Sequence, residues 1–141
     1  MNRSKVKPAV NYFLEGQPPS LVDSHTCTYL GVRISSDLRW QNHTSNISTK
    51  ASRILNFVRH NVYGCSAEAK ATAYITLVRL LLEFSSAAWD PHLAKDVHQL
   101  ECVQRRAARF VMNDYRRTTS VTSVLNQLEW SPMSVRLRNS R

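Results

Sequence analysis

The sequence predicts a mainly α-helical fold in which a short N-terminal β segment precedes four or five helices. Apolar residues recur at helical spacing over most of the chain after residue 40. Only 3 of the 141 residues are glycine, which leaves few positions for the tight turns of a larger sheet. A single domain of this length buries about two thirds of its unfolded surface. We therefore expect one helical bundle, which need not be complete.

The β segment is assigned to residues 1–38. Asn11–Leu14 and the residues after Gly16 predict two short strands around a turn, although Pro18 and Pro19 interrupt the second strand. Residues 26–34 alternate apolar and polar side chains, which predicts one further strand centred on the sequence YLGV. Helical periodicity begins after this segment, so residues 39–141 form the predicted helical region.

The first two predicted helices are long and amphipathic. Gly64 is the expected end of the first, and Ser66 is a suitable N-cap for the second, which must stop before Pro91. The second helix is apolar over much of its girth, so we expect it to be central, with Trp89 as a core anchor. The apolar face of the first consists of Ile47, Ala51, Ile54, Leu55, Val58 and Val62, and that of the second of Ala73, Tyr74, Leu77, Val78, Leu81 and Phe84.

Three further helix signals follow. A helix from Lys95 to about Asn113 is predicted, and Thr119 or Ser120 can cap a short one after it. Ser131 followed by Pro132 is another start signal, but the chain ends within two turns. A helix that begins there is expected to bury almost nothing, which suggests truncation relative to a longer parent. The apolar faces are Leu100, Val103, Ala107, Phe110 and Val111 in the first of these helices, and Val121, Val124, Leu125 and Leu128 in the second.

Truncation would leave apolar surface without a partner. The faces centred on Ile47 and Leu77 are the ones expected to lose their contacts. The chain is therefore expected to be marginally stable or to associate with itself.

The charge of the chain favours a polyanionic partner. Lysine and arginine total 19 against 10 acidic residues, which gives a net charge of +9 and a pI near 10.0. Arginine offers phosphate two parallel hydrogen bonds. At 100° per residue, Arg105 and Arg109 lie opposite the apolar face of their helix with Arg106 on its flank, so three guanidinium groups are predicted to share one side. The candidate nucleic-acid-binding residues are Arg105, Arg106, Arg109, Arg116 and Arg117, with Lys50 and Arg53 as weaker candidates.

Other classes of site find little support. Cys27, Cys65 and Cys102 are odd in number and far apart, without zinc-ligand spacing, and are expected to be reduced thiols in a cytosolic or nuclear protein. The histidines have no nucleophile at a recognisable spacing, which argues against a hydrolase. The acidic residues are scattered singly and are expected to be solvated. No metal, cofactor, signal peptide or membrane span is predicted.

An ordered series of short motifs carries a family resemblance. The motifs are Tyr29-Leu30-Gly31-Val32, Leu77-Val78-Arg79, Trp89-Asp90-Pro91, the segment VQRRAARFV from Val103 to Val111, Asn113-Asp114-Tyr115, and Leu128 to Trp130. In this order they resemble the C-terminal part of reverse transcriptases from jockey-like non-LTR retrotransposons. The resemblance extends from about Asn11 to Arg138.

The resemblance implies a thumb-side part of an RNA-directed DNA polymerase. Such a region grips an RNA or DNA template-primer duplex by its backbone, which suits cations on rigid helices. The parent polymerase uses Mg²⁺ held by an aromatic-x-Asp-Asp motif in its palm. No two acidic residues are adjacent in this sequence, so the chain alone is expected to be inactive.

Two alternatives remain open. The chain could be a helical protein-interaction module that uses the broad apolar face of the helix from Ser66 to Phe84, with its positive charge incidental. It could instead be an inert relic of a decayed transposable element.

Overall fold

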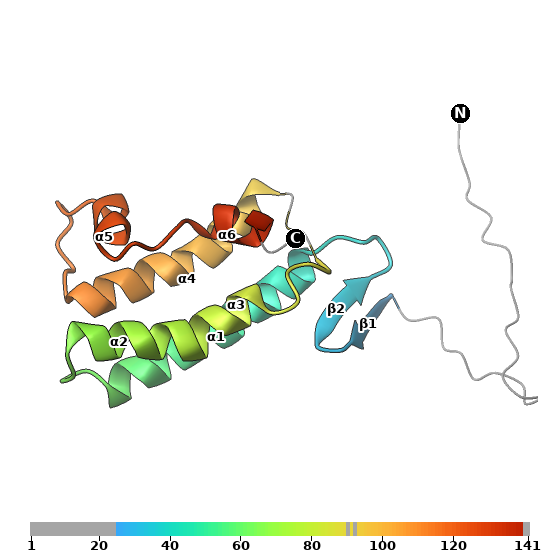
Figure 1. The fold of residues 1–141 in the computed structure, drawn as a ribbon. Coiled ribbons are helices and arrows are strands. Elements are labelled where there is room, and N and C mark those ends of the chain that lie inside the picture. Colours follow the sequence, from blue (N-terminus) through green and yellow to red (C-terminus); the bar gives the residue numbers. More distant parts are fainter. Residues whose placement is uncertain (1–24, 90, 92, 140–141) are drawn as a thin grey trace, which may run out of the picture.

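The computed structural model describes residues 25–89, 91 and 93–139. The predicted fold class is confirmed, because a two-stranded hairpin precedes five helical segments (Figure 1). The second of these segments consists of three consecutive helical elements. Residues 1–24 lie outside the described part of the chain, and with them the predicted strands around Gly16.

The hairpin replaces the single strand predicted through YLGV. Strands β1 (Thr26–Tyr29) and β2 (Val32–Ser35) pair antiparallel, with Tyr29 opposite Val32. Leu30 and Gly31 form the turn with φ of 46° and 82°, and positive φ at both central positions is typical of a type I′ turn. A Cβ at Gly31 would also lie 3.2 Å from the Phe84 ring. The alternation of side chains predicts strand conformation on both sides of the turn, but it does not reveal the turn itself.

The helices begin and end at local signals. The Ser66 side chain accepts a hydrogen bond from the Ala69 N–H (3.3 Å), as its N-cap role predicts, whereas Ser120 stands at the N-cap of its helix without a side-chain cap bond. The first helix ends before Gly64, and Asn113 ends the fourth in the left-handed conformation. The helices are α1 (Gln41–Asn61), α2 (Ala67–Ala73), the π-helix η1 (Tyr74–Arg79), α3 (Leu80–Glu83), α4 (Ala94–Met112), α5 (Val121–Gln127) and α6 (Met133–Asn139).

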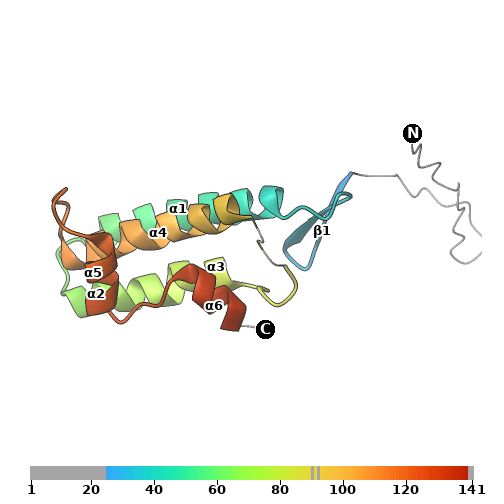
Figure 2. The same cartoon turned by 90° about the horizontal axis from the view of Figure 1, so that it is seen from above.

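Helix α4 is the central helix, and not the segment α2–η1–α3 that the sequence predicts. It packs against α1, α2, α5 and α6, and Figure 2 shows α1 and α4 in one layer with α2 and α3 in a second. The segment α2–η1–α3 buries Tyr74, Val78 and Leu82 but exposes Leu77 and Phe84 to about half. One apolar face of this segment therefore packs on the core, and a second apolar face is exposed to solvent.

The core includes one of the two faces that truncation was expected to expose, whereas Leu77 on the other face is 49% exposed. Ile47 is 8% exposed and packs within the core, so the prediction that its face lacks a partner is wrong. Helix α6 buries Met133 and Leu137, which corrects the expectation that the last helix buries almost nothing. Trp89 is buried as predicted, and its Nε1 donates to the Phe84 carbonyl (2.9 Å). Within the described ranges, every helix is too short or too polar to cross a bilayer.

Candidate nucleic-acid interface

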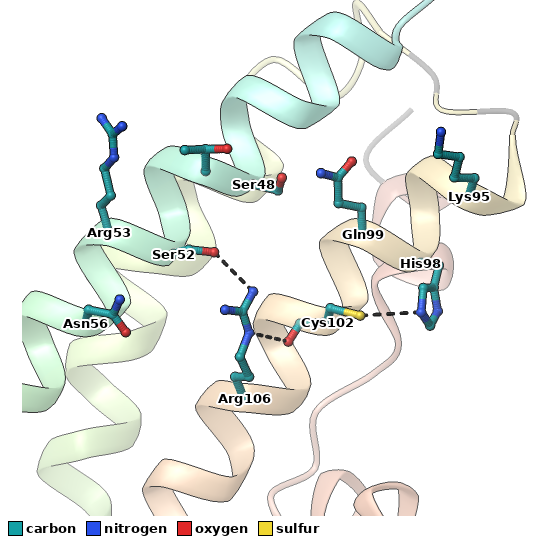
Figure 3. Close-up of a pocket in the computed structure, with 10 residues that line it drawn as sticks. Ser48, Ser52, Arg53, Asn56, Lys95, His98, Gln99, Cys102 and Arg106 are labelled. Atoms are coloured by element: carbon teal, nitrogen blue, oxygen red, sulfur yellow. Dashed lines mark hydrogen bonds between the residues drawn. The ribbon is translucent and has the colours of Figure 1, made fainter.

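A groove between α1 and α4 gathers cations from both helices (Figure 3). Its volume is about 560 Å³. Arg53 of α1 and Lys95 and Arg106 of α4 all line it, although the Arg53 side chain points away from α4 in Figure 3, and the described lining contains no carboxylate. Hydroxyl and amide groups occupy the space between the three cations. The groove lining consists of Ser48, Thr49, Ser52, Arg53, Asn56, Lys95, His98, Gln99, Cys102 and Arg106.

Arg106 is held in place over the groove by neutral partners. Its Nη2 donates to Ser52 Oγ of α1 (3.2 Å), and its Nε donates to the Cys102 carbonyl one turn earlier in α4 (3.2 Å). Neither partner neutralises the guanidinium charge, so Arg106 keeps its positive charge in a fixed position. A preorganised cation of this kind loses less side-chain entropy when it binds an anion.

The remaining lining follows from helical spacing. Thr49, Ser52, Arg53 and Asn56 lie at i, i+3, i+4 and i+7 on α1, which places them on one face. Lys95, Gln99, Cys102 and Arg106 occupy the facing stripe of α4. Lys95 and the neutral residues are not among the candidates predicted from the sequence. The polar stripe that they form on α4, beside the buried apolar stripe, is nevertheless detectable from helical spacing. The pairing of the two stripes depends on how α1 and α4 pack.

The structure separates the three arginines that the sequence places on one side of their helix. Arg105 lies 3.6 Å from the Glu101 carboxylate on the outer face of α4, whereas Arg106 turns toward α1. Arg109 is half-buried and does not line the groove. Of the three, only Arg106 lines the groove, because its side chain extends toward α1.

The turn after α4, which contains Tyr115, Arg116 and Arg117, holds an arginine that is paired with a carboxylate. Nε and Nη2 of Arg116 donate to the two carboxylate oxygens of Asp114 (3.0 and 2.9 Å), and Thr119 Oγ1 donates to the same group (2.8 Å). Hydrogen bonds from Arg116 hold the pKa of Asp114 well below its usual range, and Asp114 in turn raises the pKa of Arg116. Arg117 is exposed in the same turn. Arg116 is thus exposed but already paired, whereas Arg117 has no carboxylate partner among the described residues.

Lys50 and Arg53 are exposed on α1 as predicted, but only Arg53 lines the groove. Cys102 is partly buried, and its sulfur lies 3.5 Å from His98 Nε2. Asp96, in the first turn of α4, is an exception to the expectation that acidic residues are solvated, because it is 2% exposed. Among the described residues, no three potential metal ligands lie together.

Comparison of the chain with protein-family models, curated protein sequences and solved structures gives no match.

Proposed function

We propose that this chain binds the phosphate backbone of nucleic acids, without regard to sequence, in the groove between α1 and α4. The observation that carries the proposal is the uncompensated charge of Arg53, Lys95 and Arg106 in one concave surface. A polyanion with regularly spaced phosphates complements such a groove.

The neutral lining suits the same ligand. Hydroxyl and amide groups donate hydrogen bonds to phosphate oxygens as readily as cations attract them, and such contacts carry no base information. Asn56 of α1 and Gln99 of α4 offer amide groups, and Ser52 Oγ, which accepts from Arg106, keeps its own proton free to donate. The Ser48 and Thr49 hydroxyls already donate to the Ser45 carbonyl. We therefore expect binding without sequence preference, because no described feature of the groove favours one base over another.

The wider role that we propose rests on the family resemblance. The chain would be a thumb-side fragment of the RNA-directed DNA polymerase of a jockey-like non-LTR retrotransposon, and its ligands would be RNA and DNA template-primer duplexes. Mg²⁺ would belong to the palm of the parent polymerase, because this sequence contains no adjacent pair of acidic residues to hold it.

The salt dependence of binding tests the groove directly. Each neutralised phosphate adds about −0.9 to the slope of log K against log salt on B-form DNA. The triple variant Arg53→Gln, Lys95→Gln, Arg106→Gln should flatten that slope by up to about 2.7, because it removes three phosphate contacts. Glutamine is a good helix former, so circular dichroism should show unchanged helix content. Fluorescence anisotropy with two duplexes of unrelated sequence should give equal wild-type affinities.

A matched variant separates the groove from net charge alone. This control variant removes the same number of positive charges, three, from predicted residues outside the groove: Arg105→Gln, Arg109→Gln, Arg117→Gln. We expect it to change the slope by less than half as much as the groove variant does. Equal effects of the two variants would show diffuse attraction without a site, and a larger effect of the second would place the contact on the outer face of α4.

A further inference from the structure

The solvent side of α2, η1 and α3 carries an apolar stripe whose two halves differ in shape. At its N-terminal half, Ala69, Thr72, Ala73 and Thr76 line a shallow hollow of about 560 Å³. At its C-terminal half, large side chains project instead: Leu77 is 49%, Leu80 63% and Phe84 51% exposed. Hollow and ridge thus follow one another along a single helical segment, over about 20 Å.

We propose that a second copy of this chain docks on this stripe in antiparallel orientation, forming a two-fold symmetric dimer. A two-fold axis near Thr76 and Leu77 places the ridge of each copy over the hollow of the other, with Leu80 opposite Ala73 and Phe84 opposite Ala69. Such an interface is self-complementary, as two-fold symmetry requires. Small residues facing large ones also let the ridges of one helix enter the grooves of another.

The stripe presents little exposed charge, so a copy of the same chain can approach it despite the net charge of +9. Lys70 is buried, and Arg79 and Glu83 form an ion pair (3.9 Å) with side chains that are 15% and 19% exposed. The acidic Glu68 lines the outer end of the hollow. In the antiparallel pair it faces the Phe84 end of the other copy, where the hairpin turn lies, because a Cβ at Gly31 would be 3.2 Å from the Phe84 ring.

The stripe and the groove occupy different parts of the fold. Figure 2 shows α2 and α3 in a layer separate from α1 and α4. The hairpin turn borders the ridge, because Gly31 lies against the Phe84 ring, and Leu30, its neighbour in the turn, is 76% exposed. A single helix pair buries less than the ~800 Å² per partner of a standard interface, so we expect a reversible dimer with a Kd above about 1 µM.

Sedimentation velocity of the full chain over a range of concentrations tests the dimer. The wild type should shift from monomer to dimer, and Leu80→Asp should abolish the shift because it places a charge in each partner's hollow. Phe57→Asp is the matched control: Phe57 is 64% exposed on α1, and its replacement should leave the dimer intact. A monomeric wild type at the highest soluble concentration would overturn the proposal, as would equal effects of the two variants.

Cysteine cross-linking tests the orientation. In a background with Cys27, Cys65 and Cys102 replaced by serine, Thr76→Cys lies near the axis and should form a symmetric disulfide dimer on mild oxidation. Leu80→Cys should cross-link poorly to itself but well to Ala73→Cys in a mixture of the two chains. Efficient self-cross-linking of Leu80→Cys with none between the mixed variants would show a parallel contact and refute the antiparallel arrangement.

Discussion

His43 links the hairpin to the first helix through a buried imidazole. The ring is 1% exposed, and its Nδ1 accepts a hydrogen bond from the Arg33 N–H (3.1 Å). It meets the Trp89 ring edge-on at 4.9 Å between centroids. Because Nδ1 is the acceptor, the neutral ring carries its proton on Nε2, which has no hydrogen-bond partner in the described part of the chain. Burial lowers the pKa of His43, and the positive charges of Arg33 and Lys50 lower it further.

This lowered pKa predicts acid sensitivity. Above about pH 7 the imidazole is neutral in the folded and unfolded states, since the ordinary pKa is 6.5. As the pH falls below that value the unfolded chain binds the proton first, so folding stability is lost until the pH reaches the lower folded-state pKa. The variant His43→Gln keeps an acceptor for Arg33 and removes the titration. Its free energy of unfolding, measured by urea titration between pH 7 and 5, should decline less than that of the wild type, by up to about 1.4 kcal/mol per pH unit.

His60→Gln provides the control for that measurement. His60 is exposed on the same helix, so its replacement should leave the pH dependence unchanged. Parallel pH profiles for the wild type and His43→Gln would show that the imidazole is not coupled to folding.

The connection between η1 and the C-terminal helices depends on a stacked aromatic pair. Tyr74 and Trp130 lie 4.4 Å apart between ring centroids with planes 25° from parallel, and both are buried. Burial also raises the pKa of the Tyr74 phenol. Arg136 of α6 reaches Glu83 at the end of α3, with its Nη2 donating to Oε2 (3.1 Å). The stack and this ion pair together hold α6 against the α2–η1–α3 segment.

Removing one ring should therefore cost much more than removing an exposed aromatic side chain. Trp130→Ala leaves a cavity against Tyr74 and should destabilise the chain by about 3–5 kcal/mol, which urea denaturation followed by circular dichroism would measure. Phe57→Ala deletes a ring that is 64% exposed and should change stability by less than about 0.5 kcal/mol. A loss below about 1 kcal/mol for Trp130→Ala would mean that α6 contributes little to the folded state.

At the scale of the whole molecule, we expect nucleic-acid binding without polymerisation. Nucleotidyl transfer requires two divalent cations held by closely spaced carboxylates, and no two acidic residues are adjacent in the 141-residue sequence. Purified chain with an RNA template, a DNA primer, nucleotides and Mg²⁺ should extend no primer above a protein-free blank. An active polymerase added to the same tube verifies that the substrates are competent. Extension that follows the chain through successive purification steps would contradict this expectation.

The sequence by itself determined the helices and their buried faces. Leu100, Val103 and Phe110 recur at the helical period and are buried, and Ser66 caps the helix that its position predicts. These features depend on residues within a few positions of one another, so local spacing and local hydrogen bonds suffice to predict them.

Only the tertiary structure decided which cations share a surface. Arg53 and Lys95 are 42 positions apart in the chain, and they line one groove because α1 packs against α4. Arg106 lies on the stripe of α4 that faces α1, and its side chain reaches Ser52 only because the two helices pack together. The docking of α6 likewise depends on contacts with distant segments. Packing between segments far apart in sequence arises from the burial of all their apolar faces at once, which no local pattern encodes.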